Sequence, residues 1–144
     1  MTTSPLQHWE QYLLADDYQF LTQYLENVMY DIPNNKMILL SGPGRTGKST
    51  LQNDIRKYME GIPMLNACSN LPFNDLAHIK SAENLPKLGV YCELADIATS
   101  KKKNQAIIDL IKKKQSLIAA TSCIEIVHPE LLEHSRIIEM NHVF

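Results

Sequence analysis

The chain has 144 residues, of which 44% are hydrophobic and 21% charged, as is typical of one globular domain with its own core. Its formal net charge of −2 excludes a basic field over the whole surface, so any contact with nucleic acid has to be local. The three cysteines form no C-x-x-C pair, and no apolar run approaches the roughly 18 residues of a membrane span. We therefore expect a soluble, intracellular protein with no membrane partner.

Residues 1–35 are expected to form a helical segment ahead of a core at residues 36–144. Apolar residues recur at helical spacing before and after Asp16 and Asp17, and this acidic pair could cap the second of two helices. The sequence Pro-Asn-Asn at residues 33–35 predicts a turn that ends the segment. The segment either covers an edge of the sheet or packs against a neighbouring subunit, and periodicity does not separate these alternatives.

A phosphate-binding P-loop is predicted by the pattern G-x-x-x-x-G-K-S, which lies between an apolar strand at residues 37–40 and a helix at residues 51–60. Glycines let successive backbone N–H groups converge on a phosphate at the start of the helix. Lys48 can then reach the β- and γ-phosphates, and the Ser49 hydroxyl can bind Mg²⁺. We predict ATP and Mg²⁺ as the ligands of Gly42, Pro43, Gly44, Arg45, Thr46, Gly47, Lys48, Ser49 and Thr50.

The second and third strands are expected after the P-loop helix, which Gly61 can end as a C-cap. Residues 62–67 predict the second strand, and residues 70–75 predict a turn that leads into a short helix. Residues 88–92 form an apolar run that predicts the third strand.

Glu93 follows the third strand directly. P-loop proteins hold the carboxylate that binds Mg²⁺, or that orients the attacking water, at the end of such a strand. Glu93 is therefore our candidate for a catalytic residue and a Mg²⁺ ligand, and Asp96 is the alternative. An acidic residue that simply faces solvent is the plainer interpretation, but it becomes less favoured when a P-loop lies upstream.

Two lysine triplets, residues 101–103 and 112–114, flank an expected helix at residues 104–111. The second triplet suits the C-terminus of a helix, whereas the first would oppose the helix dipole and is expected in the preceding loop. The triplets are either a solvated surface or a local contact to the phosphate backbone of nucleic acid.

The last two strands are predicted at residues 116–122 and 136–140. The fourth strand is apolar along its length and ends at Ser122, whose hydroxyl could sense the γ-phosphate. Arg136 begins the fifth strand and is a candidate to contact phosphate in its own subunit or in a neighbour, or else to form an ion pair with Glu133 or Glu139. Because strands alternate with helices, we predict an α/β fold, a three-layer P-loop NTPase sandwich with a mostly parallel sheet of about five strands.

In this order the motifs resemble those of the superfamily 3 helicases of small DNA viruses, above all the replication initiator helicases of parvoviruses. The resemblance spans roughly residues 36–140. Residues 42–50 are similar to motif A, residues 90–93 to motif B, residues 118–123 to motif C, and residues 135–139 to the stretch that carries an arginine acting between subunits.

The resemblance implies an AAA+-like viral replication protein that hydrolyses ATP. It also implies assembly into a homo-oligomeric ring and action on single-stranded DNA or RNA in the host nucleus or cytoplasm. Its catalytic residues would be Lys48, Glu93 and Arg136.

Two departures from the family pattern leave other functions open. Leu94 follows Glu93 where the family has a second acidic residue, and Cys123 stands where the family has an asparagine. A thiol is a poorer hydrogen-bond donor than a carboxamide. One alternative is therefore a nucleotide-binding or regulatory module with little turnover. A small-molecule kinase is the second alternative, which the presence of only three arginines disfavours.

Overall fold

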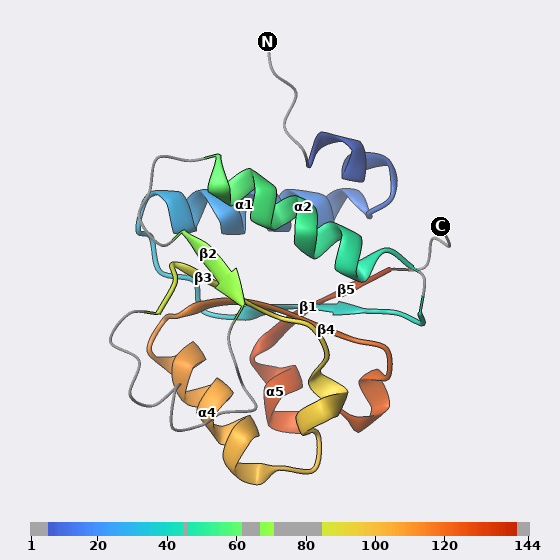
Figure 1. Ribbon diagram of the computed structural model, residues 1–144, viewed down its shortest axis with the longest axis vertical. Coiled ribbons are helices and arrows are strands. Elements are labelled where there is room, and N and C mark those ends of the chain that lie inside the picture. The colour runs from blue at the N-terminus through green and yellow to red at the C-terminus, as the bar shows by residue number, and fades with distance from the viewer. Residues whose placement is uncertain (1–5, 45, 62–66, 71–84, 141–144) are drawn as a thin grey trace.

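The computed structural model describes residues 6–44, 46–61, 67–70 and 85–140. These residues form a five-stranded sheet with helices on both faces (Figure 1). In chain order the elements are the 3-10 helix η1 (Gln7–Gln11), α1 (Ala15–Met29), β1 (Met37–Ser41), α2 (Lys48–Glu60), β2 (Cys68–Asn70), β3 (Leu88–Tyr91), the 3-10 helix η2 (Leu94–Ile97), α4 (Lys101–Lys112), β4 (Ser116–Thr121), the 3-10 helix η3 (Ile124–Ile126), α5 (Pro129–Glu133) and β5 (Ser135–Glu139).

The sheet has the strand order β2-β3-β4-β1-β5, and all four neighbouring pairs run parallel. Every residue of β1 and β4 is buried, as expected for central strands that are covered on both faces. The register pairs Ser41, the last residue of β1, with Thr121 of β4 and Glu139 of β5. The carboxyl ends of these strands therefore lie at one edge of the sheet, which confirms the predicted α/β sandwich.

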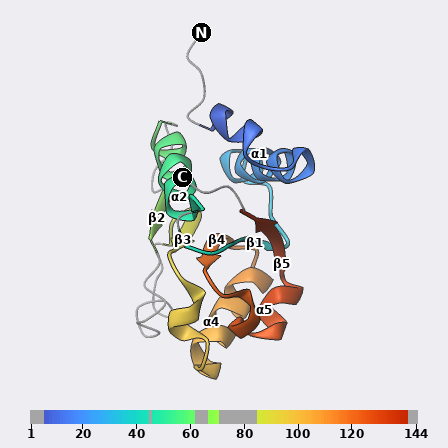
Figure 2. The same ribbon diagram turned by 90° about the vertical axis from the view of Figure 1, so that its right-hand side faces the viewer.

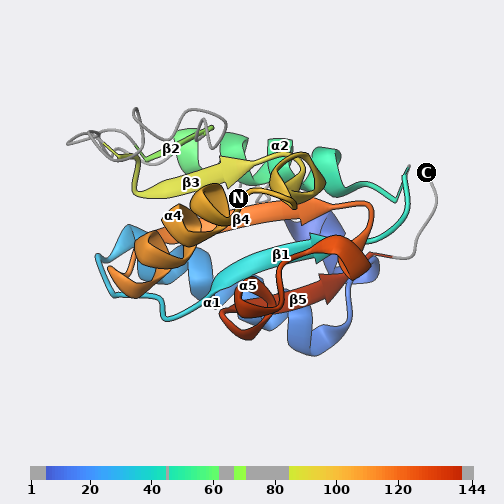
Figure 3. The same cartoon turned by 90° about the horizontal axis from the view of Figure 1, so that it is seen from below.

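Side chains of β1 alternate between two cores because successive residues of a strand point to opposite faces. Ile38 and Leu40 belong to a core with η1, α1 and α2, whereas Met37 and Leu39 belong to a core with α4 and α5. Figures 2 and 3 show the two helical layers on opposite sides of the sheet. None of the helices in the described ranges is long and apolar enough to cross a bilayer.

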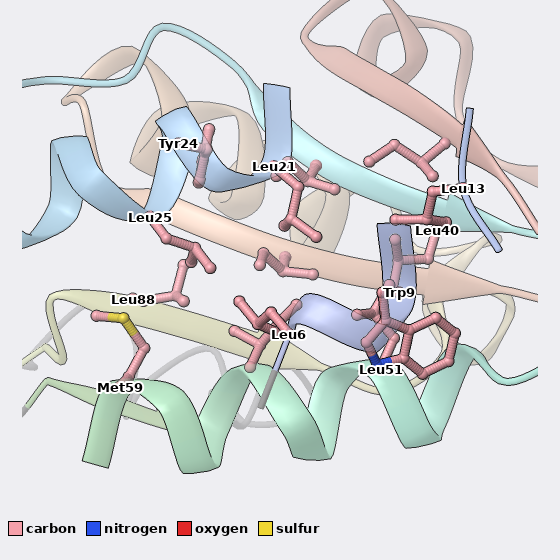
Figure 4. Packing of buried hydrophobic residues seen from close by; sticks show 14 of the residues in the cluster. Leu6, Trp9, Leu13, Leu21, Tyr24, Leu25, Leu40, Leu51, Met59 and Leu88 are labelled. Atoms are coloured by element: carbon pink, nitrogen blue, oxygen red, sulfur yellow. The ribbon is translucent and has the colours of Figure 1, made fainter. Parts of the chain in front are cut away.

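The N-terminal helices are part of the first of these cores. Trp9 is fully buried, and its indole N–H donates to Asp54 Oδ2 of α2 at 2.8 Å. Figure 4 shows Trp9 and Leu13 packed beside Leu40 and Leu51. The predicted capping role of Asp16 and Asp17 is wrong, because Leu14 is the N-cap of α1 and makes no side-chain hydrogen bond there.

The second strand begins later than expected. β2 starts at Cys68, and Ala67 precedes it with a carbonyl that accepts a hydrogen bond from Leu88 N. Residues 62–66 of the expected second strand lie outside the described residues. So do residues 71–84, which include most of the predicted turn and the short helix after it.

The prediction that residues 101–103 lie in a loop is also wrong, because α4 begins at Lys101. Ser100 is the N-cap, and its side chain accepts a hydrogen bond from Lys103 N at 3.2 Å. The buried Asn104 side chain donates to the carbonyls of Ile97 and Ser100. A serine cap stabilises a helix by about 1 kcal/mol. Together with the Asn104 bonds, this cap offsets the unfavourable meeting of exposed lysines and the helix dipole.

Just beyond α4, one residue has an unfavourable backbone conformation. Lys114 has φ 68°, a left-handed conformation that costs most residues about 1–2 kcal/mol and glycine very little. We expect Lys114→Gly to raise the free energy of unfolding by about 0.5–1 kcal/mol, since glycine loses some of this gain through its greater freedom in the unfolded chain. Denaturant titration measures the change. Lys113→Gly is the matched control, because Lys113 has φ −84°. It should lower stability, and an equal effect of both variants would contradict the explanation.

Candidate functional site

The P-loop wraps around the ammonium group of Lys48. Lys48 Nζ donates to the carbonyl oxygens of Gly42 and Pro43, the latter at 2.7 Å. The buried Thr46 hydroxyl donates to the same Pro43 oxygen at 2.7 Å. Gly47 has φ 87° at the N-cap of α2, a conformation that favours glycine. Arg45 lies outside the described residues. The loop is thus held in a compact turn at the N-terminus of α2, where anions are favoured.

Two glycines of the loop have different surroundings. A Cβ atom on Gly42 would overlap the backbone oxygen of Met140, which directly follows β5. A Cβ atom on Gly44 would meet no heavy atom within 4 Å. Gly42 is therefore required for packing, whereas Gly44 faces open space.

A pocket of about 440 Å³ opens at the carboxyl edge of the sheet. It brings together the P-loop, the residues after β3 and the end of β4, which lie far apart in the sequence. The residues that line it are Gly44, Gly47, Lys48, Ser49, Thr50, Cys92, Glu93 and Ser122. An ammonium group, hydroxyls, a carboxylate and the start of a helix thus face one space, as the binding of a phosphorylated ligand with a divalent cation requires.

Hydrogen bonds from the backbone and from a hydroxyl hold the Glu93 carboxylate. Its Oε1 accepts from Ser122 N at 2.8 Å and from Ser122 Oγ at 2.7 Å, and its Oε2 accepts from Ala95 N at 3.1 Å. Burial raises the pKa of the Glu93 carboxyl. The hydrogen bonds from Ser122, Ala95 and Thr121 outweigh this effect, so that the pKa lies below its ordinary value. Glu93 is therefore ionised at neutral pH, with Oε1 directed at Ser122 after β4 and Oε2 at Ala95 of η2.

Lys48 also responds to this environment. Burial lowers the pKa of its ammonium group, and the nearby negative charge of Glu93 offsets part of that effect. Both charged side chains line the pocket.

The residues fit Mg²⁺ in combination with a phosphate ligand. Among the described residues, no group of three His, Cys, Asp or Glu side chains could hold a metal by itself. Mg²⁺ usually keeps several waters and is held by one or two carboxylates together with substrate phosphates. The Ser49 hydroxyl and the Glu93 carboxylate line the same pocket and could supply such ligands. The alternative candidate, Asp96, is exposed and does not line the pocket.

Arg136 lies away from this pocket. It pairs in register with Ile38, three residues before the end of β1. Its guanidinium donates to Asp17 Oδ1 at 3.1 Å and lies 5.0 Å from the centre of the Phe20 ring. The ion-pair partner of Arg136 is thus Asp17 of α1. The sequence suggested Glu133 or Glu139 instead. A role between subunits stays a prediction.

Cysteines contribute to the site in a way that the motifs did not indicate. Cys92 is exposed and lines the pocket beside Glu93. Cys123 does not line it, and its thiol lies 3.2 Å from Glu125 Oε2 as a hydrogen-bond donor. The position of Cys92 at the end of an apolar strand, one residue before the candidate carboxylate, is the signal that could have found it.

Comparison with known proteins shows the fold. No family model matches the chain, and no curated protein matches it. Among solved structures, the replication initiator DnaA bound to AMPPCP and single-stranded DNA has a TM-score of 0.61 and 15% identity, and the match covers 87% of this chain and 45% of that chain. The Thermotoga maritima branch migration motor RuvB has a TM-score of 0.59 and 19% identity, covering 92% of this chain and 47% of that one.

A structure of katanin described in terms of its self-assembly gives a TM-score of 0.55 at 12% identity, covering 96% of this chain and 60% of that chain. The neighbours are AAA+ P-loop ATPases, so this chain has the fold of that group. It spans roughly half the length of the DnaA and RuvB chains.

The two P-loop glycines give a direct test of the loop geometry. We expect Gly42→Ala to lower the free energy of unfolding by about 2 kcal/mol or more, since the methyl group would displace backbone at the end of β5. Gly44→Ala should change it by less than about 0.5 kcal/mol, because the methyl group meets open space. Thermal or denaturant unfolding of both variants provides the measurement. Similar losses in the two would show that the loop is packed differently.

Proposed function

We propose that this chain binds ATP with Mg²⁺ and hydrolyses it in the pocket at the carboxyl edge of the sheet. The observation that carries the proposal is that Lys48, Ser49 and Glu93 line one pocket, although Glu93 is 44 residues beyond the P-loop serine. A glycine-rich turn without a ligand would not require an ionised carboxylate at this place. The AAA+ fold of the chain supports the same conclusion.

The residues that line the pocket have different roles in this reaction. The backbone N–H groups at the start of α2 bind phosphate oxygens, and Lys48 exchanges its bonds with the loop carbonyls for bonds to the β- and γ-phosphates. Ser49 and Glu93 would hold Mg²⁺, and the bound ion would supply positive charge beside the phosphate oxygens. Glu93 also orients the attacking water, for which it has to release one of its hydrogen bonds to Ser122.

The finer proposal is a replication helicase of the superfamily 3 kind, which assembles as a ring and acts on single-stranded nucleic acid. The order of the motifs supports it. DnaA, one of the structural neighbours, is bound to single-stranded DNA, and another neighbour, katanin, self-assembles. In this proposal Arg136 reaches the nucleotide of the adjacent subunit, which requires release from Asp17.

The basic surface of α4 supports a nucleic-acid partner. Residues 98–114 contain six lysines and one acidic residue, while the whole chain has a net charge of −2. Lys101 and Lys102 are exposed in the first turn of α4, where they oppose the helix dipole. Lysines kept at an electrostatically unfavourable position are explained if they bind the phosphate backbone.

A module that binds nucleotide with little turnover is the second candidate. It is favoured by the engagement of both Glu93 oxygens and by the contact of Cys123 with Glu125. In that case the wild-type protein binds ATP without hydrolysing it, and Cys123→Asn raises turnover.

ATP turnover and binding, measured side by side, test the main proposal. We expect Lys48→Ala to abolish turnover and to weaken ATP binding, because the ammonium group contacts the phosphates. Glu93→Gln should lower turnover by about 100-fold or more, while the variant still binds ATP. Lys57→Ala, on the exposed side of the same helix, is the control and should behave like the wild type. If the Lys48→Ala variant hydrolyses ATP at the wild-type rate, the assignment of the P-loop is refuted.

The partner of α4 is tested by replacing Lys101, Lys102 and Lys103 with alanine. We expect weaker binding of single-stranded DNA or RNA and a salt dependence reduced by up to about two units in slope, since each lost phosphate contact contributes about 0.7. The free energy of unfolding should rise by about 0.5 kcal/mol, because lysines no longer oppose the dipole. A Lys36→Ala, Lys57→Ala double variant is the control, as both lysines are exposed elsewhere. Unchanged binding in the triple variant would exclude this surface.

A further inference from the structure

Gln52 is a buried polar residue of α2 whose role the P-loop pattern does not explain. It is 3% exposed, as part of a helix whose other buried residues are Leu51, Ile55 and Met59. Burial of a carboxamide is costly unless its groups are hydrogen-bonded. Its Nε2 donates to the Tyr91 carbonyl at 3.0 Å, and this bond is buried.

This hydrogen bond connects α2 to the end of β3, and both elements contribute residues to the pocket or precede them directly. Gln52 lies four residues after Lys48, so both side chains project from the same face of α2. Tyr91 is the last residue of β3, and the next two residues, Cys92 and Glu93, line the pocket. Figure 2 shows α2 lying over β3.

The hydrogen bonds of Glu93 itself do not connect it to α2. Its hydrogen bonds run to Ser122 and Ala95, and so they fix the carboxylate against β4 and η2. The bond from Gln52 ties the end of β3 to α2, which also carries Lys48 and Ser49. Lys48 and Ser49 line the same pocket as Glu93.

We propose that Gln52 is a positioning residue of the ATPase, which sets the place of Cys92 and Glu93 relative to Lys48 and Ser49 through its hydrogen bond to the Tyr91 carbonyl. The inference rests on the proposed ATP hydrolysis at this site. Gln52 is not among the residues that line the pocket. It acts through the backbone at the end of β3, much as hydrogen-bonding partners hold ligating side chains in metal sites.

The decisive variant is Gln52→Met, which keeps the length of the side chain and removes the donor. We expect kcat to fall by about 10-fold or more, the loss typical of a removed orienting partner. The KM and the Kd for ATP should stay within about threefold, since the phosphate-binding loop is intact. Asn53→Met is the matched control, because Asn53 is exposed on the same helix. If the methionine variant fails to fold, Gln52→Asn replaces it, because asparagine withdraws the donor by one methylene group. This variant should also lower kcat and leave the KM and the Kd for ATP nearly unchanged.

The thiol of Cys92 gives a readout that does not depend on turnover. Without nucleotide, its rate of alkylation, followed by mass spectrometry for each cysteine, should rise by about threefold or more in Gln52→Met, because the end of β3 has lost its tie to α2. Cys68 serves as an internal reference, since burial raises the pKa of its thiol to about 11. ATP should protect Cys92 in the wild type.

The outcomes separate the two claims. If kcat and Cys92 alkylation in Gln52→Met match those of Asn53→Met, the positioning role is wrong. If kcat falls and alkylation rises while KM is unchanged, the role is supported. A wild type that neither binds nor hydrolyses ATP refutes the proposed function, and the alkylation rates then decide alone: faster alkylation supports the tie, and equal rates overturn it.

Discussion

Parallel pairing of the strands is the constraint on which the site depends. Because β1, β4 and β5 run in one direction, Ser41, Thr121 and Glu139 reach the same edge of the sheet. β3 joins this arrangement through its pairing of Tyr91 with Ala119. The chain leaves every strand at that edge, so the P-loop, Glu93 and Ser122 meet although they come from three separate connections. A ligand bound at the carboxyl ends of such a sheet is the usual outcome of this topology.

Buried polar side chains make this edge well defined. Thr46, Gln52 and Thr121 are almost fully buried, and each has a hydrogen-bond partner in the P-loop, at the end of β3 or after β4. In a low-dielectric interior a satisfied polar group favours one arrangement strongly, since the alternative leaves it unpaired. These bonds therefore fix the backbone segments next to the two charged residues of the pocket, Lys48 and Glu93.

The N-terminal segment is joined to the core by polar contacts as well as by apolar packing. The Tyr24 hydroxyl donates to the Lys36 carbonyl and accepts from Leu117 N, and burial raises its pKa to about 12. The ion pair of Asp17 with Arg136 links α1 to the edge strand. The Arg136 side chain is 39% exposed, so the pair is only partly buried and solvent screens much of its attraction. The contact engages the arginine for which the family resemblance implies a role between subunits.

The sequence determined the features that depend on neighbouring residues. Apolar runs predicted β1, β3, β4 and β5 to within one residue at each end, and the glycine pattern located the turn before α2. The tertiary structure alone decided which distant side chains meet. The start of α4 depended on Ser100 and on the bond of Asn104 to Ile97, which outweighed the lysine charges that the sequence made conspicuous. Arg136 forms its ion pair with Asp17, 119 residues away in the sequence, and Gln52 donates to the Tyr91 carbonyl, 39 residues away. No local pattern records these partners, because a side chain's hydrogen bonds are selected by the packing of elements that are remote in sequence.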